Sequence, residues 1–395
     1  MIYLDNHATT QLDPNALAAM LPLLHERFAN AGSVTHAAGR EIAEQIDTAI
    51  AQLAAMIGAA EDELVITSGA TESNNLALFG VCHHPRQTRR KIVSVVTEHK
   101  AVLDPLHRLQ QQGFHVELIP VLDRTSPAAG LVDLHRLSAA IDSDTAIVSV
   151  MLANNEIGVI QPLAEIAGLC RNAGCLLHTD ATQAVGRIAV DVDALDVDLL
   201  SFSAHKFHGP KGVGGLFVRR RQRRVKLQAQ IVGGGQQYNF RSGTLNTTGI
   251  VGMHAALAAC LQSLPADQHR IAALRSQLLH GLGETCRDID LNGPQFTAGT
   301  PLAPRLAGNL NCSFYPIEGQ SLMMAIPDLA VSSGSACTSA NPSPSHVLQA
   351  IGLSEEQARS SLRFGIGRFN TSEEIVQTLD WLAAAYEKLL KLIRT

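Results

Sequence analysis

Short apolar runs alternate with helix-length segments through the first half of the chain, and this alternation constrains the fold more than any other feature. The runs have the length of strands, and apolar residues at helical spacing fall between several of them. Repeated strand and helix units predict a mostly parallel sheet that is covered by helices on both faces. The strand candidates are Leu64–Thr67, Ile92–Thr97, Val116–Val121, Ala146–Leu152, Cys175–His178, Asp198–Ser203 and Gly215–Arg219.

Polar residues follow several of these runs at the point where each would end as a strand. Asn154 and Asn155 share one such place, and His99, Asp180 and Lys206 each stand at another. Ligand sites in parallel sheets lie at the carboxyl ends of the strands, where these side chains would come together. The pattern therefore predicts a single site at one edge of the sheet.

Lys206 stands in the sequence SAHKFHGPKG, between two apolar runs. Four glycines and a proline in the following turn allow the backbone to bend tightly and to pass close to a bound group. A lysine beside Ser203 and His205 is a candidate Schiff-base lysine, with hydroxyl and imidazole donors for a phosphate. The same residues also fit a glycine-rich hairpin with a solvated lysine, and Lys211 is a rival in the same loop.

A strand, a glycine turn and a helix start follow one another from Leu64 to Ser73. The helix is expected to begin near Thr71, after Gly69 and Ala70. Free backbone N–H groups and the positive end of the helix dipole suit such a place to a phosphate. An ordinary strand-to-helix connection, with a Ser or Thr cap and Glu72 in the first turn, is the alternative.

The composition favours a large packed α/β protein. Of 395 residues, 46% are hydrophobic and 4% aromatic, which suits two or three domains. A net charge of −5 provides no overall field to recruit nucleic acid or an anionic membrane. The run from Arg219 to Lys226 could dock an acidic partner or a nucleic acid, but it also fits a solvated loop. No uninterrupted apolar run approaches the roughly 20 residues of a membrane span.

The cysteines and the start of the chain predict a cytoplasmic protein. The seven cysteines are scattered and odd in number, which is typical of a reducing environment. Met1 is not followed by a charged and then apolar leader. Cys170 and Cys175 lack a second pair with zinc-ligand spacing, so we interpret both as core thiols and expect no metal site.

The sequence pattern changes after Gly249 from alternating strands and helices to long helical segments, and we use this change to place the predicted domain boundary. An alanine-rich helix is expected over Ile250–Leu264 and a second helix over Gln268–Gly281. We therefore predict a large domain over residues 13–257. Residues 1–12 and 258–395 are predicted to form a smaller domain.

Eight blocks of sequence together resemble one enzyme family. They are similar, in the same order, to the signature blocks of IscS/NifS-type cysteine desulfurases of the class V aminotransferase family. The resemblance implies an α/β fold of type I among pyridoxal-phosphate (PLP) transferases, with a mostly parallel seven-stranded sheet and a smaller α+β C-terminal domain. The blocks are SGATES (68–73), TEHKAV (97–102), NNEIG (154–158), HTDATQ (178–183), SFSAHKFHGPKG (201–212), RSGT (241–244), SSGSACTS (332–339) and SLRFGIGR (361–368).

The family reaction moves the sulfur of L-cysteine onto an enzyme cysteine as a persulfide and releases L-alanine. By resemblance, Lys206 would hold PLP and move the Cα proton, and His99 would lie over the ring and assist that transfer. Asp180 would pair with the pyridinium nitrogen, and Gln183 with the phenolic oxygen. The phosphate ligands would be the Ala70 N–H, Thr71, Ser203 and His205. Without the resemblance, Asp180 and His99 also fit helix-capping roles.

The resemblance also implies substrate and partner residues. Asn155 and Arg363 would hold the substrate carboxylate, because a guanidinium fork matches two carboxylate oxygens. An ion pair at a strand end is the alternative for Arg363. Thr244 of the RSGT block would reach the phosphate of a partner subunit's cofactor, which implies a homodimer with shared sites.

Cys337 is the expected sulfur acceptor. Its neighbours are small and polar, so the loop could carry a thiolate to the substrate and a persulfide outward. Loop composition alone fits a reactive or an inert thiol. The SSGSACTS block points to the reactive one and to the family branch with the longer loop.

The sequence fits three candidate functions. The preferred one is a cysteine desulfurase that passes sulfur to an acceptor protein, with no membrane and no direct nucleic-acid binding. A selenocysteine lyase or β-lyase on the same fold is one alternative, and a non-catalytic sulfur-carrier scaffold is the other. The chain ends at Thr395, without the C-terminal segment that meets the iron–sulfur scaffold in housekeeping members. Iron–sulfur assembly, nitrogenase maturation, tRNA thiolation and DNA phosphorothioation therefore all remain open.

Overall fold

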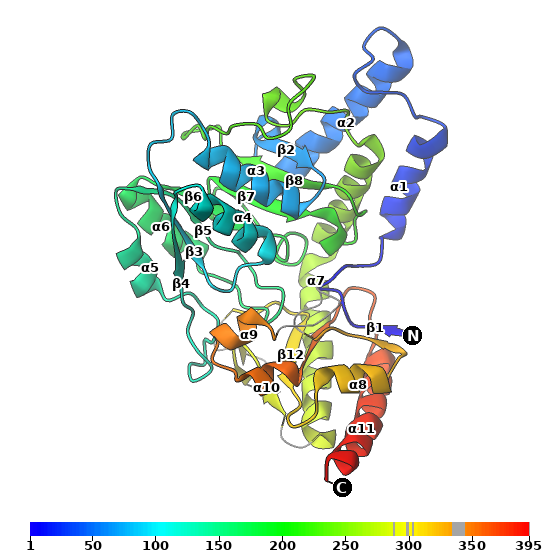
Figure 1. Ribbon diagram of the computed structural model, residues 1–395. Helices are drawn as coiled ribbons and strands as arrows, with labels where there is room; N and C mark the ends of the chain where they lie inside the picture. The colour runs from blue at the N-terminus through cyan, green and yellow to red at the C-terminus, as the bar shows by residue number, and fades with distance from the viewer. Residues whose placement is uncertain (287–288, 298–299, 302–303, 334–343, 395) are drawn as a thin grey trace.

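The computed structural model describes residues 1–286, 289–297, 300–301, 304–333 and 344–394. Figure 1 shows a larger upper part built around one sheet and a smaller lower part, with a single long helix running through both. The long helix is α7, Thr247–Thr285. Because α7 is continuous across Pro265, the two separate helices expected from the sequence are wrong. The predicted boundary at residues 257 and 258 falls inside this helix.

The large part contains the predicted seven-stranded, mostly parallel sheet. Its strand order is β2-β8-β7-β6-β5-β3-β4, and only β8 runs antiparallel to its neighbours. Each strand lies within a few residues of its predicted range. The strands are β2 (Leu64–Thr67), β3 (Lys91–Val95), β4 (His115–Ile119), β5 (Thr145–Ser149), β6 (Leu176–Asp180), β7 (Leu199–Ser203) and β8 (Gly214–Val218).

Alternating side chains of these strands enter two separate cores. On β7, Leu199 packs into the core beneath α3 and α4, while Leu200 packs into the core shared with α2, α6 and α7. Both faces of the sheet are therefore buried, as expected when helices cover a parallel sheet. The helices of this part are α1 (Pro14–His25), α2 (Ala37–Ala55), α3 (Ala70–Cys82), α4 (Lys100–Gln111), α5 (Leu134–Ala140) and α6 (Leu163–Ala173).

The small part is built on an antiparallel sheet with its own core. The sheet order is β14-β12-β9, and the N-terminal strand β1 pairs in parallel with β13. The chain start thus packs on the C-terminal part. The elements are β1 (Ile2–Tyr3), β9 (Asp290–Leu291), β10 (Phe296–Thr297), β11 (Thr300–Pro301), β12 (Asn309–Ser313), α8 (Gly319–Ala325), β13 (Leu329–Ala330), α9 (His346–Ala350), α10 (Glu355–Arg359), β14 (Ser361–Gly365) and α11 (Ser372–Arg394).

Helix α7 joins the two cores. Among the described residues it is the one helix that is long and apolar enough to cross a membrane. Its residues Met253 and Leu257 are buried in the large part, however, and Leu278 and Leu282 in the small part. We therefore interpret α7 as a core helix.

The basic run of the sequence is largely neutralised within the chain. Arg219 is buried and lies 2.7 Å from Asp193, Arg221 lies 2.9 Å from Glu63, and Arg223 contacts Asp196. These contacts favour the interpretation of an ordinary surface segment over a nucleic-acid contact, since paired arginines have less charge to offer a phosphate backbone.

We predict that Gly158→Ala destabilises the fold more than Gly113→Ala. Both glycines have positive φ, so each substitution is expected to cost about 1–2 kcal/mol in backbone strain. At Gly158 the added Cβ would also lie 2.6 Å from Cβ of Asn309 on β12, whereas nothing lies within 4 Å at Gly113. This overpacking adds about 1–3 kcal/mol. Urea unfolding of both variants measures the difference, and equal losses would contradict the packing account.

Candidate active site

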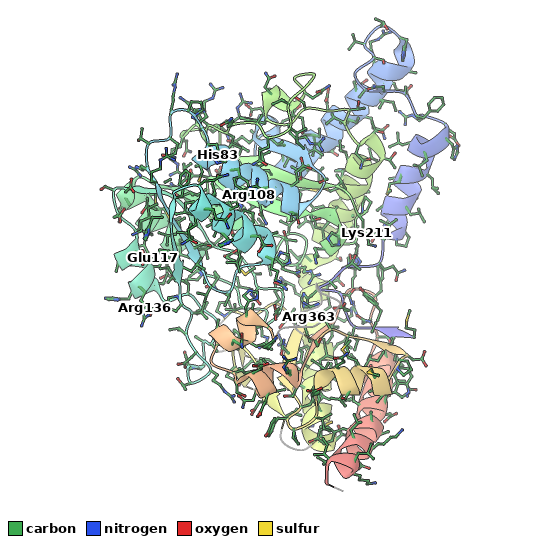
Figure 2. All side chains as sticks on the ribbon, in the orientation of Figure 1. His83, Arg108, Glu117, Arg136, Lys211 and Arg363 are labelled. Carbon is green, nitrogen blue, oxygen red and sulfur yellow. The ribbon has the colours of Figure 1, made fainter. Side chains whose placement is uncertain are left out.

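A cavity of about 950 Å³ opens at the carboxyl edge of the sheet. Parallel strands end there together, so residues from distant blocks of sequence line it. Figure 2 shows Arg363 at the level where the large and small parts meet. The predicted site residues that line the cavity are Ala70, Thr71, His99, Asn155, Asp180, Gln183, Ser203, His205, Lys206 and Arg363.

Two predicted residues are not seen in this cavity. Thr244 is exposed, and it does not line the cavity of its own chain. Cys337 lies outside the described residues. The chain on either side of it can be placed, because Ser332 bonds to Arg363 and because Pro344 and Ser345 line the cavity.

Lys206 ends a 3-10 turn, η2 (Ala204–Lys206), that directly follows β7. Its Nζ donates to the backbone oxygens of His7 and Ala8, at 2.7 Å each. Burial lowers the pKa of Lys206 to about 7, helped by the nearby positive charge of Arg187. Much of the amine is therefore neutral near pH 7, and a neutral amine can act as a nucleophile or a base.

Asp180, the last residue of β6, is fixed by two donors. Asn74 Nδ2 donates to one carboxylate oxygen at 2.7 Å, and the backbone N–H of Thr182 donates to the other at 2.9 Å. The two bonds hold both carboxylate oxygens and fix the orientation of the side chain. The sequence did not identify Asn74. Its signal was an Asn on the same face of α3 as the buried Ala77 and Leu78, three and four residues further on.

His99 is the N-cap of α4 and also lines the cavity. Its Nδ1 accepts the backbone N–H of Ala101 at 3.0 Å. A neutral ring in this position carries its proton on Nε2. Burial lowers the pKa of His99, and the charge of Asp180 opposes that shift. The capping role considered from the sequence is thus present, and it fixes the orientation of the ring.

The start of α3 provides free N–H groups beside hydroxyl groups. Gly69 precedes the helix with no side-chain cap, and its φ of 149° favours glycine. A Cβ at Gly69 would lie 3.3 Å from Ser203 Oγ, so glycine permits this close approach. His205 contacts Thr9 Oγ1 at 3.1 Å, and burial lowers the pKa of His205 to about 4. These donors suit an anion such as a phosphate.

Arg363 forms a buried network rather than the surface ion pair considered from the sequence. It is 3% exposed, and Nη2 lies 2.8 Å from Asp5 Oδ1 and 3.1 Å from Ser332 Oγ. Nη1 donates to the backbone oxygen of Asn155 at 3.2 Å. Its Nε is buried and has no partner among the described residues. The guanidinium is therefore held in place and has bonding capacity left.

Sequence reasoning also missed His7 and Glu156. The amide oxygen of Gln183 lies 2.9 Å from His7 Nδ1, and Gln183 Nε2 donates to His7 O at 2.9 Å. Glu156 accepts from Ser345 Oγ at 2.5 Å and thereby ties the N-terminus of α9 to the large part. Burial raises the pKa of Glu156. Glu156 stands inside the NNEIG block, whereas His7 lies outside all eight blocks, and neither has a sequence pattern that indicates its partner.

Comparisons with known proteins agree on one family. The model of the family described as "Aminotransferase class-V" matches residues 2–378. A protein named cysteine desulfurase IscS from Anaeromyxobacter dehalogenans is 49% identical over 375 residues, which cover 95% of this chain and 89% of that protein. The human protein named cysteine desulfurase is 46% identical over 379 residues, covering 96% of this chain and 80% of that one.

Solved structures agree with the sequence relatives. A NifS-like protein superimposes with a TM-score of 0.87 at 34% identity, covering 99% of both chains. DndA from Streptomyces lividans superimposes with a TM-score of 0.76 at 38% identity, covering 92% of this chain and 99% of that one. The expected type I fold is thereby confirmed. The chain belongs to the class V aminotransferase family, whose members are PLP-dependent enzymes.

Proposed function

We propose that this chain is a cysteine desulfurase that moves the sulfur of L-cysteine onto Cys337, releases L-alanine and passes the sulfur to an acceptor. The observation that carries the proposal is the enclosed Lys206 amine, which shares one cavity with the fixed carboxylate of Asp180. Relatives at 46–49% identity over nearly the whole chain carry the name cysteine desulfurase.

The residues of the cavity fit PLP. When bound, PLP withdraws electrons from Cα of the amino acid attached to it, which makes the Cα proton acidic and weakens bonds to the side chain. Lys206 would attach the cofactor, and Asp180 would hold the ring nitrogen protonated. His99 would lie over the ring face, and Gln183 would bond to the phenolic oxygen. The phosphate would be held by Ala70 N–H, Thr71, Ser203 and His205.

Two of these residues are suited to move protons. The Lys206 amine, with a pKa of about 7, can accept the Cα proton and return a proton to the product. His99 presents Nε2–H while its Nδ1 stays bonded to the start of α4. We therefore assign proton transfer at Cα to Lys206 and a donor role to His99.

Asn155 and Arg363 would orient the substrate. Arg363 still has a buried Nε without a partner among the described residues. A substrate carboxylate placed there would gain charge-assisted hydrogen bonds inside a water-poor site. The backbone of Asn155 already contacts Arg363, so the two residues would act from one place.

Chain connectivity supports a role for Cys337 at this cavity. Ser332, five residues before it, bonds to Arg363, and Pro344, seven residues after it, lines the cavity. We propose that its thiolate forms an S–S bond with the substrate sulfur. The C–S bond breaks, its electron pair stays on the carbon, and protonation of that carbon gives alanine.

We further propose that the protein is a homodimer in which Thr244 reaches the site of its partner. The outer face of α1 and the turn after it expose an apolar stripe formed by Leu17, Leu21, Leu24 and Phe28, with exposed fractions of 46%, 46%, 61% and 75%. Large apolar side chains in such a row are typical of a protein interface. Ile231 and Val232, in the segment before Thr244, are also exposed.

We place the protein in the cytoplasm, supported by cysteines that are free and buried throughout the described residues. The acceptor is proposed to be a protein. One relative comes from the bacterium Anaeromyxobacter dehalogenans, and the relative from Dictyostelium discoideum is named a probable mitochondrial cysteine desulfurase. DNA phosphorothioation, tRNA thiolation and iron–sulfur assembly thus remain candidate pathways for the same transfer step.

We predict that Cys337→Ala lowers alanine formation from L-cysteine by at least about 100-fold, because the nucleophile for sulfur is lost. Cys82→Ala is the matched control. Burial raises the pKa of Cys82 to about 12, so its thiol is inert and its loss should leave activity within about twofold. Alanine released from cysteine and from selenocysteine measures both reactions. Wild-type turnover of cysteine by Cys337→Ala would contradict the persulfide route.

We also predict that Asn74→Ala weakens PLP binding by about tenfold. Loss of a buried bond to a charged group costs about 1.5–3 kcal/mol, part of which is recovered by water. Asn75→Ala is the control, because the side chain of Asn75 bonds only to the backbone oxygen of Thr71 among the contacts described. Equilibrium dialysis against PLP measures both variants. Equal affinity in the two would show that Asn74 does not support Asp180.

A further inference from the structure

The guanidinium of Arg187 binds the backbone of Lys206 and has no carboxylate partner among the described contacts. Arg187 lies in the turn that follows β6. Its guanidinium donates to the backbone oxygen of Lys206, with Nε at 3.2 Å and Nη2 at 3.0 Å. It also donates to the backbone oxygen of Asn6, and its Nη1 lies 2.6 Å from Nδ1 of His7.

Holding this charge is unfavourable for the fold itself. Burial lowers the pKa of Arg187 to about 10, which shows how poorly the surroundings replace water around the cation. Neutral oxygens and an imidazole satisfy the hydrogen bonds of a guanidinium but do not balance its charge. A partly buried cation that meets no carboxylate among the described contacts calls for an explanation beyond packing.

The contacts of Arg187 connect two segments that meet at the Lys206 amine. On one side it holds the backbone of Lys206. On the other it holds Asn6 and His7, and the carbonyls of His7 and Ala8 accept the hydrogen bonds of Lys206 Nζ. One guanidinium therefore fixes both the lysine and the two oxygens toward which its amine points.

We propose that Arg187 is a positioning residue for Lys206, which clamps the N-terminal segment against the lysine and keeps an unbalanced positive charge beside its amine. The inference deepens the proposed function and rests on the assignment of Lys206. A neutral amine is the form of Lys206 that would hold PLP through its aldehyde group. It can also accept a proton from Cα, whereas an ammonium can do neither.

The charges around the amine agree with this role. Burial is the largest cause that lowers the pKa of Lys206, Arg187 is the second and Arg363 the third, while the carboxylates oppose them. Three neighbouring imidazoles have pKa values lowered by burial and add little charge near pH 7. The charged and titratable groups near Lys206 are Asp5, His7, His99, Asp180, Arg187, His205, Lys211 and Arg363.

The test measures the titration of Lys206 itself. Full-length protein freed of PLP is labelled with trace acetic anhydride, which reacts with neutral amines, from pH 5.5 to 10. Mass spectrometry then follows the peptide that contains Lys206. In the wild type we expect a midpoint near 7. Protein loaded with PLP should be protected at Lys206, which verifies that the peptide reports on the site.

Arg187→Gln removes the charge but keeps an amide donor. We expect its midpoint to rise by about one pH unit, so that labelling at pH 7 becomes about fivefold slower. The midpoint should stay below the ordinary lysine value of about 10.4, because burial persists. Arg187→Lys keeps a charge and should titrate close to the wild type. Arg136→Gln, an exposed residue of α5 at the far side of the large part (Figure 2), is the control for arginine loss.

The outcomes separate this inference from the proposed function. A folded Arg187→Gln protein that titrates like the wild type overturns the role of Arg187, even if it forms alanine. Equal upward shifts in Arg187→Gln and Arg187→Lys also overturn it, because charge would not be the cause. A wild-type Lys206 midpoint above about pH 9 also overturns the role of Arg187, and this result does not require either variant to fold. If the Lys206 midpoint shifts in Arg187→Gln while the wild-type protein forms no alanine from L-cysteine, the result supports the role of Arg187 and contradicts the desulfurase activity.

Discussion

The contact between the N-terminal segment and the Lys206 amine is the interaction on which the site depends. Two backbone oxygens of that segment accept hydrogen bonds from the amine. Asp5 forms an ion pair with Arg363 of the small part, and the Thr10 hydroxyl donates to the backbone oxygen of His205. Ten residues at the chain start thus join the sheet edge to the small part. The site is therefore formed only when both parts of the chain are folded around this segment.

Much of the fold could be predicted because it follows from local periodicity. Short apolar runs with polar ends fixed the strands, and parallel strands must end at one edge, so Asp180 and Lys206 could be expected to meet. Helix α7 could not be predicted, because Pro265 normally ends a helix. Here α7 packs against both cores, and burial along its length outweighs the local preference of one residue.

Contacts that join distant parts of the sequence explain what was missed in the site. Asn74 bonds to Asp180 across 106 residues, and Asp5 meets Arg363 across 358. No spacing rule connects such pairs, since their proximity is set by sheet order and by the return of the chain to its start. Resemblance to a family identified residues such as Lys206 that form motifs. Supporting residues such as His7 and Arg187 form none.

The residues that sequence reasoning missed have one effect in common, because they set the charge around the Lys206 amine. Arg187 and Arg363 are held near the amine, while Asp180 is engaged by Asn74 and Asp5 by Arg363. Burial and the two guanidinium groups together favour the neutral amine, which is the form that reacts with an aldehyde. A substrate carboxylate bound at Arg363 would then balance part of this positive charge. Cations that are costly in the free protein thereby become favourable once the ligands are bound, so the site is more complementary to its ligands than to water.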